Sequence, residues 1–326
     1  MGRIFFPLRD FYDSTIEYVG IKSGLLLSRF RTRDILLKKF KEEFLINDEL
    51  DGFVRIRSEH IMDMVIFIRK QIGNLPQKLP SVDAWRRIHD FIELNGPIDI
   101  MFIGSISSVT SRAINENPGI SCLELSAVLE KRHNYPKEIS KDVAIVGMET
   151  YDQNIVIPDK LDWDGGSNLS DLFDCEVPSE AGHDFIDQKF LDYLAINGHE
   201  IEAIHWRNFE RFCAEYFKRQ GYSVQLGPGK NDGGVDVRVF NPDKAEKPLI
   251  LVQCKRYKKE NKVSIETVKS FYSDVIFEGA EKGLIVTSSY IAPGGAKIRD
   301  SRSYNLDFAE HDKVKQWAKN MWKYNK

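Results

Sequence analysis

Two stretches in the C-terminal part of the chain place polar side chains inside apolar strands. The first, "GKNDGGVDVRVF" (229–240), has Asp236 among valines, and the second, "PLILVQCKRYKK" (248–259), carries Gln253 and Lys255 two residues apart. Because side chains alternate between the faces of a strand, Gln253 and Lys255 share one face, and Asp236 lies beside them if the two strands pair. Three polar groups gathered in this way predict a site on the sheet.

A fourth polar group lies on a helix expected at about 206–220, which ends at a glycine. Glu210 falls within or beside the apolar stripe of this helix, whereas Glu215 falls on the opposite, polar face. The stripe is formed by Trp206, Phe209, Cys213, Tyr216 and Phe217. A glutamate on the core side of a helix is costly unless it is paired or bound to a metal. We therefore add Glu210 to the predicted site.

The four residues supply the groups that phosphodiester hydrolysis needs. Glu210, Asp236 and Gln253 offer oxygen ligands, and Mg²⁺ prefers oxygen ligands and takes only one or two carboxylates from a protein. Such an ion lowers the pKa of a bound water and neutralises charge on the scissile phosphate. Lys255 can orient or deprotonate the attacking water and stabilise the developing charge. Each residue alone also fits a turn, a strand edge or a salt bridge, so the prediction rests on the set.

The same residues lie in a longer pattern, "FERFCAEYFKRQGYSV…DGGVDVRVF…LILVQCKRYKK…GLIVTSSYIAPGGAKI". This pattern, over about residues 205–300, resembles the catalytic domain of the Mrr-like restriction endonucleases. These enzymes are a branch of the PD-(D/E)XK nuclease superfamily with glutamine in the usual acidic position of the third motif. The resemblance implies that Glu210, Asp236 and Gln253 hold the metal and that Lys255 is the catalytic lysine. It also implies Mg²⁺ as the ion, with Mn²⁺ as a substitute, DNA as the substrate, and a homo-oligomer, a dimer or larger, for double-strand cleavage.

The order of elements expected around these motifs is α-β-β-β-α-β, which is a mixed sheet flanked by helices. The predicted fold class is α/β, with a restriction-endonuclease-like C-terminal domain preceded by a mainly helical α+β N-terminal domain. Apolar periodicity and turn residues place the downstream strands at 222–226, 234–240, 248–254 and 283–288, and the later helices at 263–278, 293–302 and 311–323.

The N-terminal part, residues 1–195, carries no motif with recognisable chemistry. Domains added to this nuclease family commonly recognise DNA or a trigger, so the resemblance leaves a recognition or regulatory role for it. The second domain is expected at 196–326. Residues 158–187 hold nine acids and one base and predict a linker or surface loop. Periodicity predicts helices at 32–46, 81–94 and 121–132, with Ser81 and Ser121 as N-caps, and short strands at 142–147 and 154–158.

The charge distribution indicates the kind of partner, and the cysteines indicate the cellular environment. Residues 201–326 hold 23 Lys and Arg against 16 Asp and Glu, a net charge of +7, while residues 1–200 carry −10. This excess favours a polyanionic partner for the C-terminal half. The four cysteines are scattered, which favours reduced thiols and a cytoplasmic protein, and no apolar run is long enough to span a membrane. The residues expected to reach DNA phosphates are Lys230, Arg256, Lys258 and Lys259.

Three functions remain open on the sequence. The first is a Mg²⁺-dependent DNA endonuclease of the restriction or phage-defence type. The second is a repair or recombination nuclease that acts on branched DNA, since one fold serves several biological roles. The third is a non-catalytic DNA-binding or effector-sensing module, which the intact set of four polar residues disfavours.

Overall fold

The computed structural model describes residues 3–44, 52–78, 80–95, 100–152, 166–177, 185–229, 234–243 and 247–325. The chain forms two compact units, one made of residues 1–75 together with 164–326 and the other of residues 76–163. Among the described helices, none combines the length and the apolar character needed to cross a membrane.

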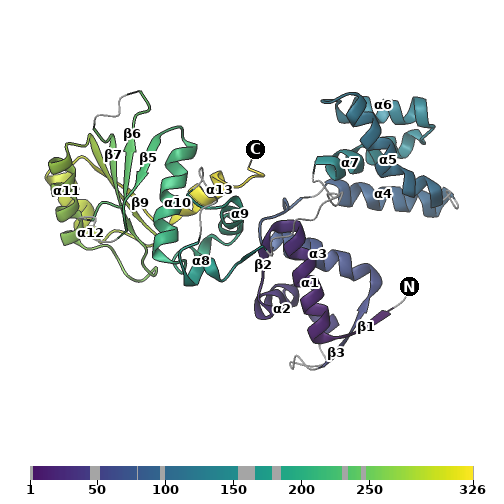
Figure 1. Cartoon of the computed structure of the whole chain (residues 1–326), viewed down its shortest axis with the longest axis horizontal. Helices are drawn as coiled ribbons and strands as arrows, with labels where there is room; N and C mark the ends of the chain where they lie inside the picture. Colours follow the sequence, from purple (N-terminus) through teal and green to yellow (C-terminus); the bar gives the residue numbers. More distant parts are fainter. Residues whose placement is uncertain are drawn as a thin grey trace. The chain divides into compact units, whose positions relative to one another are not determined.

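The first unit is built around a five-stranded mixed sheet (Figure 1). Its strand order is β5-β6-β7-β8-β9, where β5 to β7 are antiparallel neighbours and β7 to β9 are parallel ones. The strands are β5 (Ser223–Leu226), β6 (Val237–Phe240), β7 (Ile250–Lys255), β8 (Lys282–Thr287) and β9 (Leu306–Ala309). The first four match predicted strands, whereas β9, a four-residue strand with one aspartate in it, was missed.

Helices cover both faces of this sheet, as Figure 1 shows. One face packs on α10 (Trp206–Arg219) and α13 (His311–Asn320) through a cluster that includes Val237 and Val252. The other face packs on α11 (Ile265–Glu278) and α12 (Pro293–Ser301) through a cluster that includes Leu251. The predicted α/β class and the mixed sheet flanked by helices are therefore confirmed.

The beginning of the chain belongs to the same unit as the sheet. One buried cluster runs from its helices through α9 (Gln188–Ile196) to α10 and the sheet. The domain boundary predicted near residue 195 lies at the end of α9, inside this unit, and stays a prediction. The elements are β1 (Arg3–Pro7), α1 (Leu8–Ser23), β2 (Leu25–Leu26), α2 (Arg29–Leu37), η1 (Lys41–Phe44), β3 (Phe53–Arg57) and α3 (Ser58–Gln71), and a further short helix, η2 (Gly198–Glu200), follows α9.

The helix predicted at 32–46 is divided in the structure. The α-helix α2 ends at Leu37, and a 3₁₀ turn, η1, follows at Lys41–Phe44; residues 45 and 46 lie outside the described residues. The N-terminus of α2 is capped by the Ser28 side chain, which accepts from the backbone N–H of Arg31 at 3.2 Å.

The second unit is helical, with α4 (Pro80–Asn95), α5 (Ile100–Glu116), α6 (Cys122–His133) and α7 (Lys137–Asp152). The helices predicted at 81–94 and 121–132 are confirmed, and Ser121 forms a capping box with Glu124. Ser81 is not an N-cap, because α4 begins one residue earlier. The strand predicted at 142–147 is wrong, because this run lies in α7. Helix α7 packs on α4, α5 and α6, so apolar residues lie on most of its sides and the run resembles a buried strand. Residues 154–158 lie outside the described residues.

The acidic segment is partly buried where the structure describes it. Residues 166–177 contain β4 (Ser167–Asn168), which pairs with β2, and the short helix α8 (Asp171–Asp174). The side chains that it buries are Leu169, Leu172, Val177 and, after a gap, Ile186. The predicted linker or surface loop thus contains two short elements, and apolar residues between its acids anchor them in the core; the role of the segment as a linker stays a prediction.

Candidate active site

Glu210 lies in the interior, as its helical phase predicts. Helix α10 presses Phe209, Phe212 and Cys213 onto the sheet, and Glu210 beside them is only 6% exposed. Its carboxyl group lies next to that of Asp236, close enough for a hydrogen bond between the two side chains. The helix thus brings the first predicted residue to the second.

Glu215 does not lie on an exposed face, which corrects the prediction for it. It is 1% exposed, accepts from the backbone N–H of Phe185 at 2.9 Å and pairs with Arg219 at 2.7 Å. The cover comes from the acidic segment, where the Asn208 side chain of α10 accepts from the Val177 N–H at 3.0 Å. Since this segment is some thirty residues away in sequence, helical periodicity alone did not predict that α10 is buried on both sides.

Asp236 is held immediately before β6 by backbone groups on either side. Its N–H donates to the Val252 carbonyl at 3.0 Å, and its carbonyl accepts from Gly227 at 2.8 Å. Its carboxylate accepts from the Cys254 N–H at 2.6 Å. Gly227 is needed here, because a Cβ would lie 2.9 Å from the Val235 carbonyl oxygen. The strand begins at Val237 rather than at the predicted residue 234.

Gln253 lies on β7 next to the turn that leads to Asp236. Its amide Nε2 donates to the Gly234 carbonyl at 2.9 Å, and Gly234 has a positive φ of 88° that favours glycine. The other end of the amide, Oε1, is buried and accepts no hydrogen bond from any of the described residues. A buried carbonyl-type oxygen without a donor is uncommon in folded proteins and points to a ligand or a water.

Lys255 is the last residue of β7 and shares a strand face with Gln253. It is half-buried. Its backbone carbonyl accepts from the Thr287 Oγ1 at 2.7 Å, which fixes the end of the strand. The structure therefore brings the side chains of Glu210 and Asp236 together. Gln253 is hydrogen-bonded to the turn before Asp236, and Lys255 lies two residues after Gln253 on the same strand.

The electrostatics of the site centre on Glu210. Burial raises the pKa of its carboxyl to about 8; Arg207 opposes this through a hydrogen bond, and the charge of Asp236 adds to it. Burial likewise raises the pKa of the neighbouring Cys254 thiol, and its proximity to Cys213 adds to this. Two carboxyl groups in one buried place repel each other unless a proton or a cation lies between them.

Arg207 is a site residue that the sequence did not reveal. Its guanidinium is buried, donates to the Glu210 carboxylate at 2.7 Å and to the Gly227 carbonyl at 2.8 Å. It also lies 3.6 Å from a carboxylate oxygen of Glu176 in the acidic segment. The i, i+3 spacing of Arg207 and Glu210 was a usable signal, but such pairs are common on exposed helices.

A second set of unforeseen residues supports the segment after β7. The Ser288 hydroxyl donates to the Tyr257 carbonyl at 2.7 Å and accepts from the Tyr257 N–H at 2.8 Å. The Ser289 hydroxyl donates to the Lys259 carbonyl at 3.0 Å. Both serines are fully buried, so the end of β8 holds the basic segment in place.

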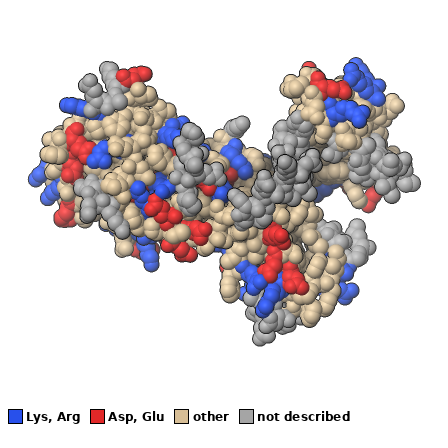
Figure 2. Space-filling view, viewed as in Figure 1, with Lys and Arg blue, Asp and Glu red and all other residues tan. Residues whose placement is uncertain are grey.

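The predicted phosphate contacts differ in their surroundings. Lys258 and Lys259 are exposed, whereas Arg256 is half-buried and donates to the Glu202 carbonyl at 2.9 Å. Lys230 lies outside the described residues. On the face shown in Figure 2, Lys and Arg around the sheet are scattered among Asp and Glu rather than gathered in one patch.

The donor set fits a hard divalent cation. Glu210, Asp236 and Gln253 present only carboxylate and amide oxygens, which is the ligand chemistry of Mg²⁺ and Mn²⁺ rather than of zinc or copper. The buried Gln253 Oε1 without a donor and the two adjacent carboxyl groups are the observations that support this fit.

Comparison with known proteins gives one family match over part of the chain. Residues 201–318 match the model of a restriction endonuclease family, the Mrr catalytic domain, which confirms the predicted resemblance and supports a nuclease. An uncharacterized protein, y4cE, from Sinorhizobium fredii is 24% identical over 115 residues, or 35% of this chain and 29% of that protein. The solved MspJI restriction endonuclease in complex with a 27-mer oligonucleotide matches at 18% identity, with a TM-score of 0.33, over 46% of this chain and 37% of that one. The chain thus spans about a third of the length of these relatives.

Proposed function

We propose that this chain, whose residues 201–318 match a restriction endonuclease family, is a Mg²⁺-dependent DNA endonuclease that uses Glu210, Asp236, Gln253 and Lys255. The observation that carries the proposal is the buried Gln253 Oε1, which lacks a donor among the described residues; the adjacent carboxyl groups of Glu210 and Asp236 support it. A family match supplies the reaction class, and the site supplies the residues.

In this proposal the residues of the site divide metal binding, proton transfer and charge stabilisation among them. When bound, Mg²⁺ supplies charge neutralisation at the scissile phosphate and a water of lowered pKa. Asp236, fixed by the Cys254 N–H, and Gln253, fixed by the Gly234 carbonyl, hold ligand oxygens in place. Glu210 completes the set or accepts a proton, and Arg207 keeps its carboxylate oriented. Lys255 orients the attacking water and stabilises charge on the phosphate oxygens.

The substrate and the setting are part of the same proposal. The net charge of +7 in residues 201–326 and the exposed Lys258 and Lys259 suit a DNA backbone. Cutting both strands calls for two copies of the site, hence a homo-oligomer. A restriction or phage-defence role in the cytoplasm follows the family match, while the complete polar set argues against a non-catalytic DNA-binding module.

The test is a digestion panel with the full chain. Supercoiled plasmid, methylated and unmethylated, and a branched DNA junction are incubated with Mg²⁺, with Mn²⁺ and with EDTA. We expect cleavage in either metal and none in EDTA. Cleavage restricted to the junction would replace the restriction role by a repair role, and intact DNA in every lane would contradict the proposed function.

A further inference from the structure

The antiparallel pair β1–β3 presents one face to solvent that no part of the proposed nuclease site uses. The register pairs Arg3 with Arg57, Phe5 with Arg55 and Pro7 with Phe53, so these six side chains share the outer face. All six residues are exposed, while Val54 and Ile56 between them are buried. This outer face, here called the ribbon face, holds three arginines, two phenylalanines, one proline and no acid.

The two phenylalanines are stacked on each other in the open. The rings of Phe5 and Phe53 lie 4.8 Å apart between centroids at 11°, yet the residues are 64% and 55% exposed. Exposed apolar side chains that lie together mark a contact surface more often than single exposed ones do. An exposed aromatic face next to arginines suits a base with a sugar-phosphate backbone.

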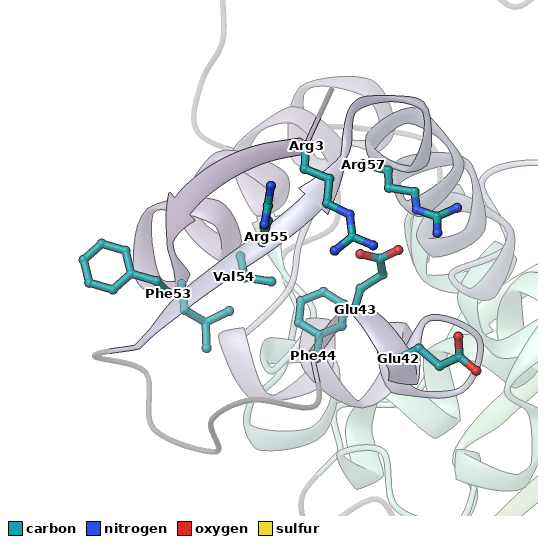
Figure 3. Close-up of a pocket in the computed structure, with 9 residues that line it drawn as sticks. Arg3, Glu42, Glu43, Phe44, Phe53, Val54, Arg55 and Arg57 are labelled. Atoms are coloured by element: carbon teal, nitrogen blue, oxygen red, sulfur yellow. The ribbon is translucent and has the colours of Figure 1, made fainter. Parts of the chain in front are cut away.

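The arginines at the other end of the ribbon border a pocket of 290 Å³ (Figure 3). Arg3 and Arg57 extend toward it in this view, and Phe53 lies at the far end of β3. The remaining wall comes from η1, where Glu43 is 2.8 Å from the His60 ring. The lining residues are Arg3, Leu8, Glu42, Glu43, Phe44, Phe53, Val54, Arg55 and Arg57.

These three arginines differ from others nearby in lacking protein partners. Arg29 pairs with Asp13 at 2.6 Å, and Arg31 pairs with Glu200 at 2.8 Å. Within the described part of the chain, no hydrogen bond or ion pair is made to the guanidinium groups of the ribbon face. Their donors are therefore open to phosphate oxygens, which a guanidinium binds with two parallel hydrogen bonds.

We propose that the ribbon face binds single-stranded DNA, with its three arginines on phosphates and its phenylalanine pair stacked on a base. A single strand fits better than a duplex, because base faces are covered by their neighbours in a duplex and are free in an unpaired segment. A strand of five residues spans about 14 Å, which matches about four stacked nucleotides. The inference rests on DNA being the substrate of the proposed nuclease, and it adds a contact away from the nuclease site.

The test uses the full chain in EDTA, so that binding is measured without cleavage. Fluorescence anisotropy follows a labelled 12-nucleotide oligothymidylate, a 12-base-pair hairpin duplex and an RNA of the same length over a range of NaCl concentrations. Phe5→Leu/Phe53→Leu should weaken binding of the single strand by about tenfold at an unchanged salt slope, because the loss is stacking. Arg3→Ala/Arg55→Ala/Arg57→Ala should flatten that slope by about two units.

The controls separate this face from a general loss of charge or fold. Arg86→Ala/Arg112→Ala/Arg132→Ala removes three exposed arginines from α4, α5 and α6, and Phe30→Leu changes an exposed phenylalanine of α2; both should bind as wild type. Circular dichroism melts verify the fold of each variant. Single-strand binding that survives in both ribbon variants, an equal loss on the duplex, or a tenfold preference for RNA would each overturn the proposal.

Plasmid digestion in Mg²⁺ keeps the two proposals apart. If the wild-type chain cuts no DNA while the ribbon variants lose single-strand binding, the nuclease function fails and this inference stands. If the wild-type chain cuts DNA and the ribbon variants bind the single strand normally, this inference alone fails.

Discussion

Glu210 and Glu215 occupy the same helix and are both buried, but their partners differ. Glu210 lies beside the Asp236 carboxyl group and pairs with Arg207, whereas Glu215 pairs with Arg219 and also accepts from a backbone N–H. A carboxyl group with a full set of protein partners stabilises the fold, and one that faces another carboxyl group is placed for a ligand.

The two glutamates therefore give a matched pair of variants. We expect Glu210→Gln to reduce metal-dependent cleavage by at least about tenfold, the cost of one charged contact in a transition state. Its melting temperature at pH 7 should change little, because the raised pKa leaves the wild-type carboxyl protonated and uncharged at that pH. Glu215→Gln should leave the rate constant near wild type but lower stability by about 1–3 kcal/mol, since it weakens a buried ion pair. Single-turnover rates and thermal melts measure both. An equal loss of rate in the two variants would remove Glu210 from the site.

The raised pKa of Glu210 predicts a pH dependence of metal binding. With its pKa at about 8, the carboxyl is protonated at pH 7 in the metal-free chain and must release that proton to the solvent when a cation binds. The apparent affinity for Mn²⁺ should thus rise by about tenfold per pH unit up to pH 8 and then level off. Calorimetry in two buffers of different ionisation enthalpy counts the released proton, and Glu210→Gln should abolish it.

The same shift has a defined sign for stability without metal. The folded state holds the proton of Glu210 more tightly than the unfolded state, in which the pKa of a glutamate is 4.5. The protonated carboxyl therefore adds its full contribution to the free energy of unfolding at low pH, and this contribution is lost as the pH rises toward 8. The measurement compares the free energy of unfolding of the metal-free wild type with that of Glu210→Gln from low pH to pH 8. A difference in favour of the wild type that grows with pH would contradict the burial of this carboxyl.

At the scale of elements, the sequence predicted the helix phase and the strand faces because both depend on local periodicity. The i, i+3 spacing of Arg207 and Glu210 was visible in the sequence, but the burial of this pair and of Glu215 was not. The groups that cover them come from 166–177, from Phe185 and from the turn at Gly227. Strand β9 and the helical α7 were misjudged for the same reason: a short mixed strand and a helix enclosed by three others have no clear local period.

The segment after β7 carries a prediction of its own. Lys258→Ala/Lys259→Ala should flatten the salt dependence of duplex binding by about two units, because each exposed lysine is expected to neutralise one phosphate. Lys313→Ala/Lys319→Ala on α13 is the matched control and should leave the slope unchanged. Arg256→Ala should instead lower the melting temperature, since its guanidinium is tied to the Glu202 carbonyl. The same slope in the Lys258/Lys259 variant and the wild type would place the DNA groove elsewhere.

At the scale of the whole molecule, the beginning and end of the chain are joined around α9. The Trp322 indole donates to the Gly73 carbonyl at 2.8 Å, and the Asn197 amide donates to the Gln71 carbonyl at 2.8 Å. Gly73 approaches α9 so closely that a Cβ would lie 1.9 Å from the Asp192 carbonyl oxygen. Such contacts between distant segments are the part of the fold that local sequence patterns do not specify.

Truncation tests how the nuclease part depends on these contacts. A fragment of residues 196–326 loses α9 and with it four large buried apolar side chains, Phe190, Leu191, Tyr193 and Leu194. At about 1.5–3 kcal/mol each, their sum rivals the total stability of a domain, about 5–15 kcal/mol. We expect residues 166–326 to melt at a clearly higher temperature than residues 196–326. Equal melting temperatures would instead support a domain boundary at residue 195.

Single-turnover cleavage with saturating protein shows whether Asp236 and Lys255 act in phosphodiester hydrolysis. Plasmid and Mg²⁺ are held constant, and wild type, Asp236→Asn and Lys255→Ala are compared after anisotropy in EDTA shows similar DNA affinity. We expect linear product with the wild type and none above background with either variant, because contacts elsewhere supply DNA binding while these two residues supply the chemistry. Cleavage at the wild-type rate by either folded variant would contradict this expectation.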